Sequence, residues 1–539
     1  MHLVKGAFIL KFIALGGAGE VGASCYLLEI AGKKILLDAG LRVNRLGKES
    51  LPYLNKLDHV DLVIISHAHM DHSGAIPLVY KRFPEAPIIC TYPTKLLSEV
   101  LWKDSVKIWN DLEEEGGPAP LYDLELVEQT SFKLQDRPFN EWFEPIPDIK
   151  LYLHPSGHIM GAAAVLIDTE DAKVVFTGDM SAVKQRTVDG MEPIDFFNPN
   201  VVITESTYGG NIHASRKAEE QALARDIGDV LENGGTVLIP SFALGRAQEL
   251  ILILVNSMRG GQIPKYDLYV DGMVRTICDL YSEMEDDWPQ SLKNFVKNSR
   301  QPLYWNQGGK NIPKVEKVNY KERYGLLVDM TPKIIISSSG MLTGGPSVLY
   351  AQSILERDNG AIFFTGYQDE EAPGRALLEL KTGDEFQLAD KKFKVRCKIG
   401  KYNLSAHADQ IHLCQQLSYM SPDAVILIHG EREALQSLRT KLLDKYVVWV
   451  AQNGAEINPL ESPKWLGEST AMQLEVENLI FTGTLQEFKN GRVGLKFEED
   501  LAGTDAFKKF FSGFTRVEGK VRGNKLIVKA VPEEDKSQT

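Results

Sequence analysis

One short segment constrains this chain more than any other. His67, His69, Asp71 and His72 lie within six residues, directly after an apolar strand expected over 61–66. A regular helix or strand would splay these side chains, whereas a tight loop can direct them to one point. Imidazoles and carboxylates are the ligands of divalent metals that prefer nitrogen and oxygen. The spacing therefore predicts a metal site, with a solvated polar loop as the alternative.

Composition is that of an ordinary globular protein. The chain has 539 residues, 43% apolar and 25% charged, so it is not a disordered, collagenous or coiled-coil chain. This length predicts three or four domains. A net charge of −13 argues against coating nucleic acid through bulk charge. It does not exclude a nuclease that binds nucleic acid through metals and a local basic patch.

Cysteine usage and the N-terminus predict the compartment. The five cysteines form no CxxC pair, which favours a reducing compartment, and we expect the cytoplasm. The N-terminal segment lacks the pattern of a signal peptide. No uncharged apolar run reaches the length of about 18 residues that a membrane span needs.

The secondary-structure pattern changes along the chain. The first 200 residues favour short strands with a few helices, and strand–helix alternation from about residue 214 predicts a parallel α/β unit. Residues 286–330 are polar and irregular, so we expect surface connections there. A long strand and two more strand–helix units are expected after Lys391, and short β-like runs beyond Pro459.

Three further motifs accompany the histidine segment. Asp38 ends an apolar strand, His158 lies in a Gly-rich turn, and Asp179 follows another strand in Thr177-Gly178-Asp179. With His67–His72, these motifs occur in order over residues 16–180. The pattern resembles the metallo-β-lactamase superfamily.

Later motifs indicate a branch of that superfamily. They are Thr204–Gly209 with Glu205, Pro240–Glu249, Ser338–Gly345, Ser405–Asp409 with His407, and Ile428–Glu431 with His429. Together they resemble the β-CASP nucleic-acid processing nucleases, most closely the RNA-cleaving group typified by the cleavage and polyadenylation endonuclease subunit. The resemblance covers roughly residues 10–455.

The resemblance implies an α/β architecture in several parts. A metallo-β-lactamase αββα sandwich is expected from residues 1–206 and 386–457, and an inserted α/β β-CASP domain from 207–385. Residues 458–539 match no known motif, and we expect a small β-rich module of unknown role.

The resemblance also implies residue roles. His67, His69 and His158 would hold a first metal, Asp71, His72 and His429 a second, and Asp179 would bridge them. Two Zn²⁺ per chain suit these ligands best, with Mn²⁺ as the alternative. Asp71 is also counted with the catalytic residues, and Asp38 would orient a ligand. His407 is the candidate general acid, with Glu205 beside it to keep it protonated.

Substrate contacts are harder to assign. Arg246, Ser339, Gly340 and Arg375 are candidate RNA-binding residues, although Gly-rich turns often serve chain reversal and arginines are often surface residues. The basic and aromatic stretch 505–530 could bind single-stranded RNA or form a homodimer.

These observations predict a metal-dependent ribonuclease that cleaves single-stranded RNA in RNA processing or decay. We expect endonuclease action, with 5′-to-3′ exonuclease action as a further option. A DNA-processing β-CASP nuclease is one alternative, but such relatives typically lack the histidine that this chain keeps as His429. A non-catalytic scaffold subunit is the other, and it is disfavoured because no ligand is lost.

Overall fold

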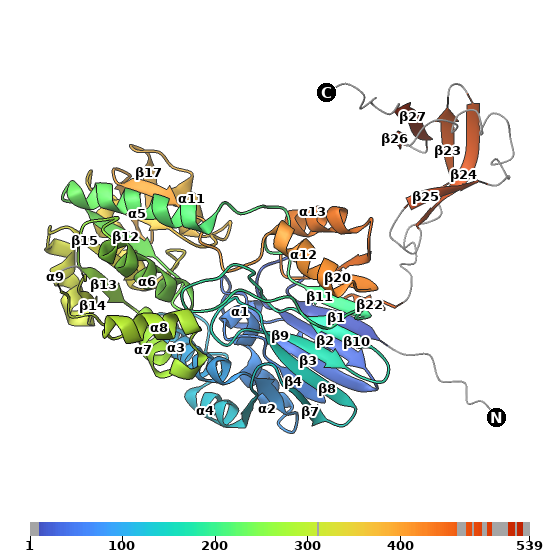
Figure 1. The fold of residues 1–539 in the computed structure, drawn as a ribbon, viewed down its shortest axis with the longest axis horizontal. Coiled ribbons are helices and arrows are strands. Elements are labelled where there is room, and N and C mark those ends of the chain that lie inside the picture. Colours follow the sequence, from blue (N-terminus) through green and yellow to red (C-terminus); the bar gives the residue numbers. More distant parts are fainter. Residues whose placement is uncertain are drawn as a thin grey trace.

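A computed structural model describes residues 10–309 and 312–460, together with the backbone of five strands between residues 471 and 531. The chain forms a layered sandwich and, beside it, a second α/β unit (Figure 1). Within the described residues, no helix combines the length and the apolar character needed to cross a lipid bilayer.

Two seven-stranded sheets lie at the centre of the sandwich, with strand orders β22-β1-β2-β3-β4-β5-β6 and β21-β20-β11-β10-β9-β8-β7. The first sheet contains β1 (Lys11–Gly16), β2 (Cys25–Ile30), β3 (Lys33–Ala39), β4 (Leu62–Ile64), β5 (Ile88–Cys90), β6 (Leu134–Asp136) and β22 (Glu456–Ile457). The second contains β7 (Trp142–Ile146), β8 (Ile149–Pro155), β9 (Ala163–Asp168), β10 (Lys173–Phe176), β11 (Val201–Thr204), β20 (Ala424–Leu427) and β21 (Val447–Val450).

Apolar side chains from both sheets fill the space between them. Phe12 and Tyr26 of the first sheet belong to the same buried cluster as Leu151 and Phe176 of the second. Removing this surface from water is the main force that holds two sheets face to face. This packed core holds the ends of the strands, and the loops that follow them, in fixed positions.

Helices cover the outer face of each sheet. The first sheet packs against α1 (Met70–Ser73), α2 (Ile76–Arg82), α3 (Tyr92–Glu114) and α4 (Leu124–Lys133), and the second against α12 (Gln410–Met420) and α13 (Arg432–Leu442). Short 3₁₀ turns occur at η1 (Gly47–Ser50), η2 (Leu54–Lys56), η3 (Glu285–Asp287) and η4 (Tyr320–Glu322). The expected αββα layering is confirmed.

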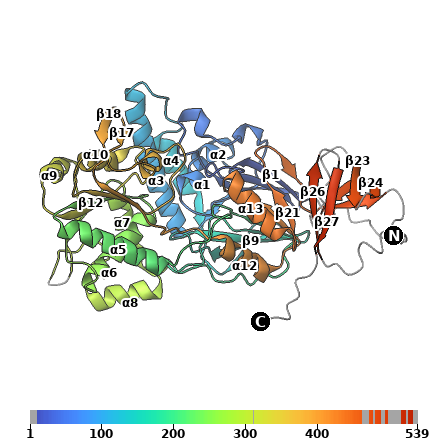
Figure 2. The same ribbon diagram turned by 90° about the horizontal axis from the view of Figure 1, so that it is seen from above.

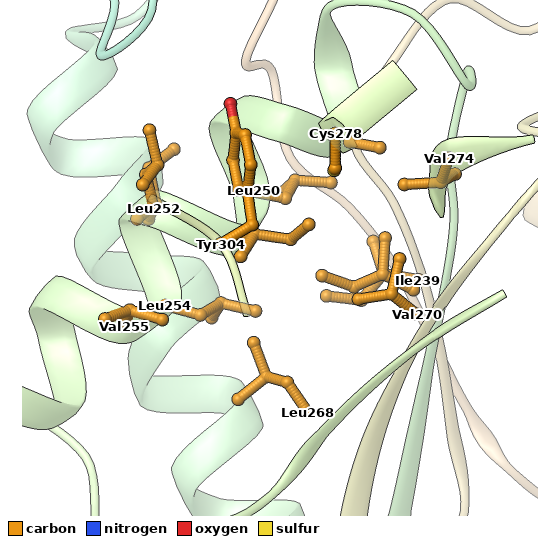
Figure 3. Packing of buried hydrophobic residues seen from close by; sticks show 14 of the residues in the cluster. Ile239, Leu250, Leu252, Leu254, Val255, Leu268, Val270, Val274, Cys278 and Tyr304 are labelled. Atoms are coloured by element: carbon orange, nitrogen blue, oxygen red, sulfur yellow. The ribbon is translucent and has the colours of Figure 1, made fainter. Parts of the chain in front are cut away.

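The inserted unit is built on a six-stranded sheet whose strands are all parallel. Its order β14-β13-β15-β12-β16-β19 uses β12 (Thr236–Pro240), β13 (Leu268–Asp271), β14 (Val315–Lys317), β15 (Lys333–Ser337), β16 (Ala361–Phe364) and β19 (Lys398–Lys401). One face packs on α5 (Arg216–Glu232), α6 (Arg246–Arg259) and α7 (Val274–Glu283), and the other on α10 (Gly345–Ile354) and α11 (Pro373–Leu378). Figure 3 shows Leu250 and Leu254 of α6 against Ile239 and Val270 of the sheet.

The stretch 286–330 differs from the expected surface connection. It contains α8 (Gln290–Ser299), α9 (Arg323–Val328) and β14. Phe295 and Val296 of α8 pack against the apolar cluster under α6 and α7, so a helix forms there because its apolar face is partly buried. The segment contains few apolar residues, so its sequence does not show the periodic pattern that predicts a helix.

The single long strand expected after Lys391 is also wrong. The chain forms β18 (Lys391–Lys394), which pairs with β17 (Glu385–Leu388), and then β19, which pairs with β16 of the parallel sheet. By strand pairing, the inserted unit therefore continues through Lys401, beyond the expected boundary at 385. The position of β19 depends on its pairing with β16, which is distant in sequence. The domain boundaries themselves remain a proposal.

The sandwich and the inserted unit share one hydrophobic cluster. Leu97 of α3 and Ile159 and Met160 of the sandwich belong to the same cluster as α6 and α7. Figure 2 shows α3 beside the inserted unit. The two units are thus joined by apolar packing along this side.

The C-terminal strands form a five-stranded sheet in the order β25-β24-β23-β27-β26. They are β23 (Ala471–Val476), β24 (Leu479–Glu487), β25 (Val493–Phe497), β26 (Arg516–Arg522) and β27 (Lys525–Val531). The β-rich character expected here is confirmed. The aromatic residues Phe507–Phe514, part of the suggested RNA-binding or dimer surface, lie outside the described residues.

Candidate metal centre

The histidine segment is held in place by contacts to the ends of β2 and β3. The backbone N–H of Ser24 donates to the carbonyl of Asp71 at 2.8 Å, and that of Leu41 donates to Met70 at 2.9 Å. Gly40 is required here, because a Cβ on it would lie 1.7 Å from the Asp71 carbonyl oxygen. The short helix α1 begins at Met70, so Asp71 and His72 lie in a helix and only His67 and His69 lie in the loop before it.

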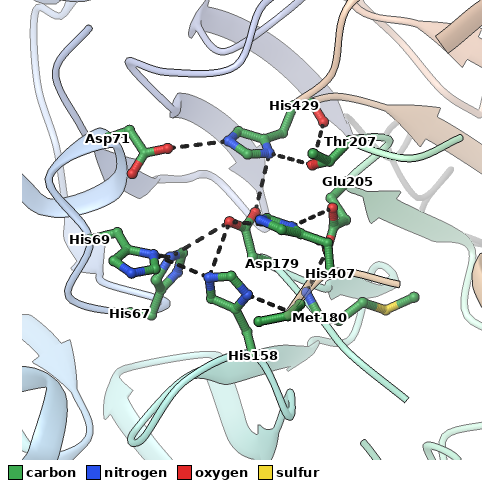
Figure 4. Close-up of polar contacts among 12 residues, drawn as sticks. His67, His69, Asp71, His158, Asp179, Met180, Glu205, Thr207, His407 and His429 are labelled. Atoms are coloured by element: carbon green, nitrogen blue, oxygen red, sulfur yellow. Dashed lines mark hydrogen bonds and ion pairs between the residues drawn. The ribbon is translucent and has the colours of Figure 1, made fainter. Parts of the chain in front are cut away.

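The predicted ligands come together from distant parts of the chain (Figure 4). Donor atoms of His67, His69 and His158 lie within 4.8 Å of one another, and so do those of a second group. The second group is Asp71, His72 and His429.

Asp179 lies between the two groups. Its Oδ2 is 3.7 Å from Nε2 of both His67 and His158, and 3.4 Å from Nε2 of His72. Its Oδ1 is 3.3 Å from Nδ1 of His429. One carboxylate thus faces both groups, the arrangement that a bridging ligand needs.

Asp38 and Ser66 orient two of the imidazoles. Nδ1 of His72 donates to Asp38 Oδ2 at 2.8 Å, and the Ser66 hydroxyl donates to the same oxygen at 2.7 Å. Because that hydroxyl proton is directed to Asp38, Nδ1 of His67 is the donor in its 3.0 Å contact with Ser66 Oγ. Both imidazoles therefore direct Nε2 inward.

Backbone carbonyls orient the other two histidines of the first group. His158 Nδ1 donates to the Ala406 carbonyl at 2.9 Å, and His69 Nε2 lies 3.4 Å from the Leu244 carbonyl. The inward nitrogens, His158 Nε2 and His69 Nδ1, are 3.1 Å apart. An outward N–H bonded to an acceptor, with the other nitrogen free, is the usual state of a metal-bound histidine.

The charge state of the cluster suits a cation. Burial, followed by the neighbouring histidines, holds the pKa values of His67 and His158 well below the usual range. Burial raises the pKa of Asp179, but His429 and His72 outweigh it and hold that pKa well below the usual range. Burial lowers the pKa of His72, but Asp179 and Asp71 outweigh it and hold that pKa well above the usual range. Neutral imidazoles and ionised carboxylates are the forms that bind metal, so His72 would release a proton when a cation binds.

Two buried atoms at the centre have no hydrogen bond within the described residues. They are Asp179 Oδ1 and His429 Nε2. Their nearest charged partners are His429 Nδ1, 3.3 Å from Asp179 Oδ1, and Asp71 Oδ2, 3.5 Å from His429 Nε2. Buried polar atoms are nearly always hydrogen-bonded, so two without a hydrogen bond at a point of convergence fit a metal ligand set. The residues present therefore match the group that the sequence predicts.

A second feature adjoins the cluster. His407 Nδ1 lies 3.0 and 3.2 Å from the two carboxylate oxygens of the fully buried Glu205, whose Oε1 also accepts the Met180 N–H at 2.7 Å. Burial lowers the pKa of His407, but Glu205 and then Asp179 outweigh it and raise the pKa to about 9. With Nδ1 bonded to Glu205, Nε2 is the nitrogen free to donate a proton.

The four candidate RNA-binding residues lie on the inserted unit. Gly340 packs against Phe242, Ser339 Oγ lies 2.9 Å from Thr343 Oγ1, and Arg375 is a half-exposed partner of Glu379 at 3.1 Å. Arg246 begins α6 and is buried. In the part of the chain that the structure describes, no hydrogen bond or ion pair joins these four to the histidine cluster.

The sequence did not indicate three of the groups that orient the histidines. Ser66 directly precedes the motif, so its position was the only available signal. The carbonyls of Leu244 and Ala406 belong to apolar residues, and a backbone oxygen leaves no mark in a sequence pattern.

Comparisons with known proteins agree with this geometry. Residues 18–205 match the metallo-beta-lactamase superfamily, 247–377 the Beta-Casp domain, and 392–451 the Zn-dependent metallo-hydrolase RNA specificity domain. The matched ranges cover all the predicted metal ligands and Glu205 and His407. The chain is a β-CASP protein of the metallo-β-lactamase superfamily.

Curated relatives include several nucleic-acid proteins. The chain is 33% identical to the transcription termination factor FttA of Methanothermobacter thermautotrophicus, over 81% of this chain and 69% of the relative. It is 32% identical to an RNase J-like protein of Methanocaldococcus jannaschii, over 79% and 93%. It is 29% identical to the endoribonuclease YSH1 of Kluyveromyces lactis, over 81% and 57%.

A solved structure shares the fold. A protein of unknown function from Enterococcus faecalis superimposes with a TM-score of 0.50 at 16% identity. The match covers 84% of this chain and all of that one.

Proposed function

We propose that the protein is a metal-dependent ribonuclease that hydrolyses phosphodiester bonds of single-stranded RNA. The observation that carries the proposal is the convergence of seven ligand side chains beside the His407–Glu205 pair. Relatives named as ribonucleases support RNA as the substrate. The retained His429 also favours RNA over the DNA-processing alternative, and the complete ligand set disfavours a scaffold role.

The chain's own residues provide two metal sites in this proposal. His67, His69 and His158 would hold one ion and Asp71, His72 and His429 the other, with Asp179 shared. Imidazole and carboxylate ligands suit Zn²⁺, with Mn²⁺ as the alternative. When bound, the ions would supply Lewis acidity that activates water and neutralises phosphate charge.

His407 supplies the proton that the reaction needs. Its Nε2 donates a proton to the departing 3′ oxygen while Glu205 holds the Nδ1 proton and keeps the ring cationic. Water adds to phosphorus and releases one proton to solvent, the P–O3′ bond breaks, and O3′ takes the proton of His407, so the products carry a 5′ phosphate and a 3′ hydroxyl.

The location of the protein is also part of the proposal. Five free cysteines support a reducing location such as the cytoplasm.

A cleavage assay tests the proposal. Single-stranded RNA and DNA of one sequence, labelled at either end, are incubated with purified protein with and without a chelator. We expect RNA cleavage that chelator abolishes and that added Zn²⁺ or Mn²⁺ restores. End-labelled products separate internal cleavage from 5′-to-3′ removal of nucleotides.

Two outcomes would contradict the proposal. Preferential cleavage of DNA would favour the DNA-processing alternative. RNA cleavage that persists after metal has been removed would show that the cluster is not the catalytic centre.

A further inference from the structure

Arg246 is a buried cation that forms no hydrogen bond or ion pair through its side chain within the described residues. Its side chain is 7% exposed, and Nη1 is fully buried without a hydrogen bond. Arginine cannot discharge by losing a proton at ordinary pH, so an unpaired buried guanidinium is strongly unfavourable. Such a group is expected where an anion binds.

The nearest acidic side chain on the same helix is already saturated. Glu249, one turn further along α6, is 1% exposed. Its Oε1 accepts the Thr187 N–H and hydroxyl, both at 2.6 Å, and its Oε2 accepts the Arg186 N–H at 2.8 Å. The Glu249 charge is therefore committed to the loop that follows Asp179.

Arg216 forms an ion pair with the Glu249 carboxylate. Its Nη2 donates to Glu249 Oε2 at 3.2 Å, and its Nε pairs with Glu220 at 3.2 Å. Its Nη1 lies 3.4 Å from the carbonyls of Leu404 and Ser405, just before His407. Glu249 and Glu220 attract Arg246 only from a distance, whereas their direct ion pairs go to Arg216, so Arg246 has no direct counter-charge within the described residues.

Arg246 lies on the side of the site where His407 lies. Burial raises the pKa of Tyr208, and Ser405 and then the nearby Arg246 guanidinium oppose that rise. The Tyr208 ring centroid is 6.1 Å from that of His407. Arg246 also begins a helix of 14 residues, whose N-terminal end adds positive potential.

We propose that Arg246 binds the RNA phosphate immediately 5′ to the scissile phosphate. The inference rests on the proposed function, in which His407 protonates the 3′ oxygen of the departing nucleotide. That nucleotide carries its own 5′ phosphate, which is the next anion along the strand on the His407 side. A guanidinium can pair with this phosphate through two parallel N–H donors.

A phosphate-neutralisation scan tests the position. A short RNA with one defined cleavage site is prepared as a series, each member with a single uncharged methylphosphonate at a different linkage. Affinity is measured by fluorescence anisotropy with metal-stripped protein, and initial cleavage rates with metal-loaded protein. For wild type, we expect neutralising the linkage 5′ to the cleavage site to weaken binding, or to raise KM, about 10- to 100-fold.

The Arg246→Met variant makes the scan specific. On unmodified RNA, this variant should lose about as much affinity as wild type loses when the linkage 5′ to the cleavage site is neutral. Neutralising that linkage should cause no further loss of affinity in the variant. Arg246→Lys should recover part of the affinity, because it keeps the charge without the paired donors. Arg225→Gln, which alters an exposed arginine of α5, is the matched control and should reproduce the wild-type scan.

Stability separates a ligand-binding role from a structural one. Removing an unpaired buried charge while keeping the apolar stem should leave the thermal midpoint of the free protein unchanged or higher. A scan in Arg246→Met that keeps wild-type sensitivity at the 5′ linkage would overturn the inference, as would a markedly lower midpoint. Failure of wild type to cleave RNA would instead count against the proposed function.

Discussion

At the residue scale, the site depends on which ring nitrogen of each histidine carries the proton. Asp38, Ser66 and two backbone carbonyls contact the outward nitrogens, so the nitrogens that face inward are fixed before any ion binds. This preorganisation lowers the cost of ordering the ligands when metal binds.

Replacing Asp38 tests the orienting role. Asp38 adopts a φ of +57°, which asparagine tolerates, so Asp38→Asn removes the charge without disturbing the backbone. We expect metal affinity to fall by about 10- to 100-fold, measured by competition with a chelating dye. Asp136→Asn, at a half-exposed ion pair, is the control, and equal affinities in the two variants would contradict the assignment.

Replacing His407 tests the proton donor. We expect His407→Ala to slow cleavage by about 10²- to 10⁴-fold with metal content unchanged, because the ring is proposed as an acid and not a ligand. Elemental analysis of the purified variant is the second measurement. Loss of bound metal would show that His407 belongs to the ligand set.

The pairing of Glu205 with His407 predicts non-additive kinetics. If Glu205 acts through His407, Glu205→Gln should slow cleavage in wild type but have little further effect in His407→Ala. Single-turnover rates of the four proteins give the coupling. Independent, multiplicative losses would separate the two roles.

At the element scale, the turn into α6 brings the inserted unit to the metal site. Gly245 has a φ of +86°, and a Cβ there would lie 2.6 Å from Cγ2 of Ile159, next to the candidate ligand His158. Leu244, whose carbonyl faces His69, and Arg246 flank this glycine. One turn therefore positions a ligand contact and the unpaired cation together.

Gly245→Ala should destabilise the protein more than a matched glycine change. Gly234 has a φ of +73° but nothing within 4 Å of its Cβ position, so Gly234→Ala introduces backbone strain alone. We expect Gly245→Ala to cost about 1–3 kcal/mol beyond that strain, because Ile159 must shift. Urea unfolding of both variants gives the difference, and equal losses would show that the close approach relaxes freely.

At the scale of the whole molecule, the two units are joined differently along two edges. One edge is the shared apolar cluster that contains Leu97. The other is polar: Arg45 pairs with Glu371 at 2.7 Å, and Tyr367 donates to Glu431 at 2.6 Å. Apolar packing and exposed polar contacts differ greatly in their contribution to stability.

That asymmetry has measurable consequences. Leu97→Ala should lower the free energy of unfolding by about 2–5 kcal/mol. Glu371→Gln, at an exposed pair, should lower it by no more than about 1 kcal/mol. Denaturant titrations followed by tryptophan fluorescence compare the two, and comparable losses would contradict this account of the interface.

The sequence by itself predicted the candidate ligands and the layered α/β fold. Residues 67–72 are contiguous and the later motifs follow in order along the chain, and their resemblance to the β-CASP nucleases implied the ligand set. The same local logic failed for α8 and for the pairing of β19 with β16, because both depend on partners distant in sequence.

Only the tertiary structure decided how the site is tuned. It showed which nitrogen of each histidine faces inward, that Glu249 is saturated by Thr187, Arg186 and Arg216, and that Arg246 is consequently unpaired. Hydrogen-bond partners and burial arise from contacts between segments tens to hundreds of residues apart. Such contacts leave no periodic pattern in the sequence, and they control the charge that each side chain presents.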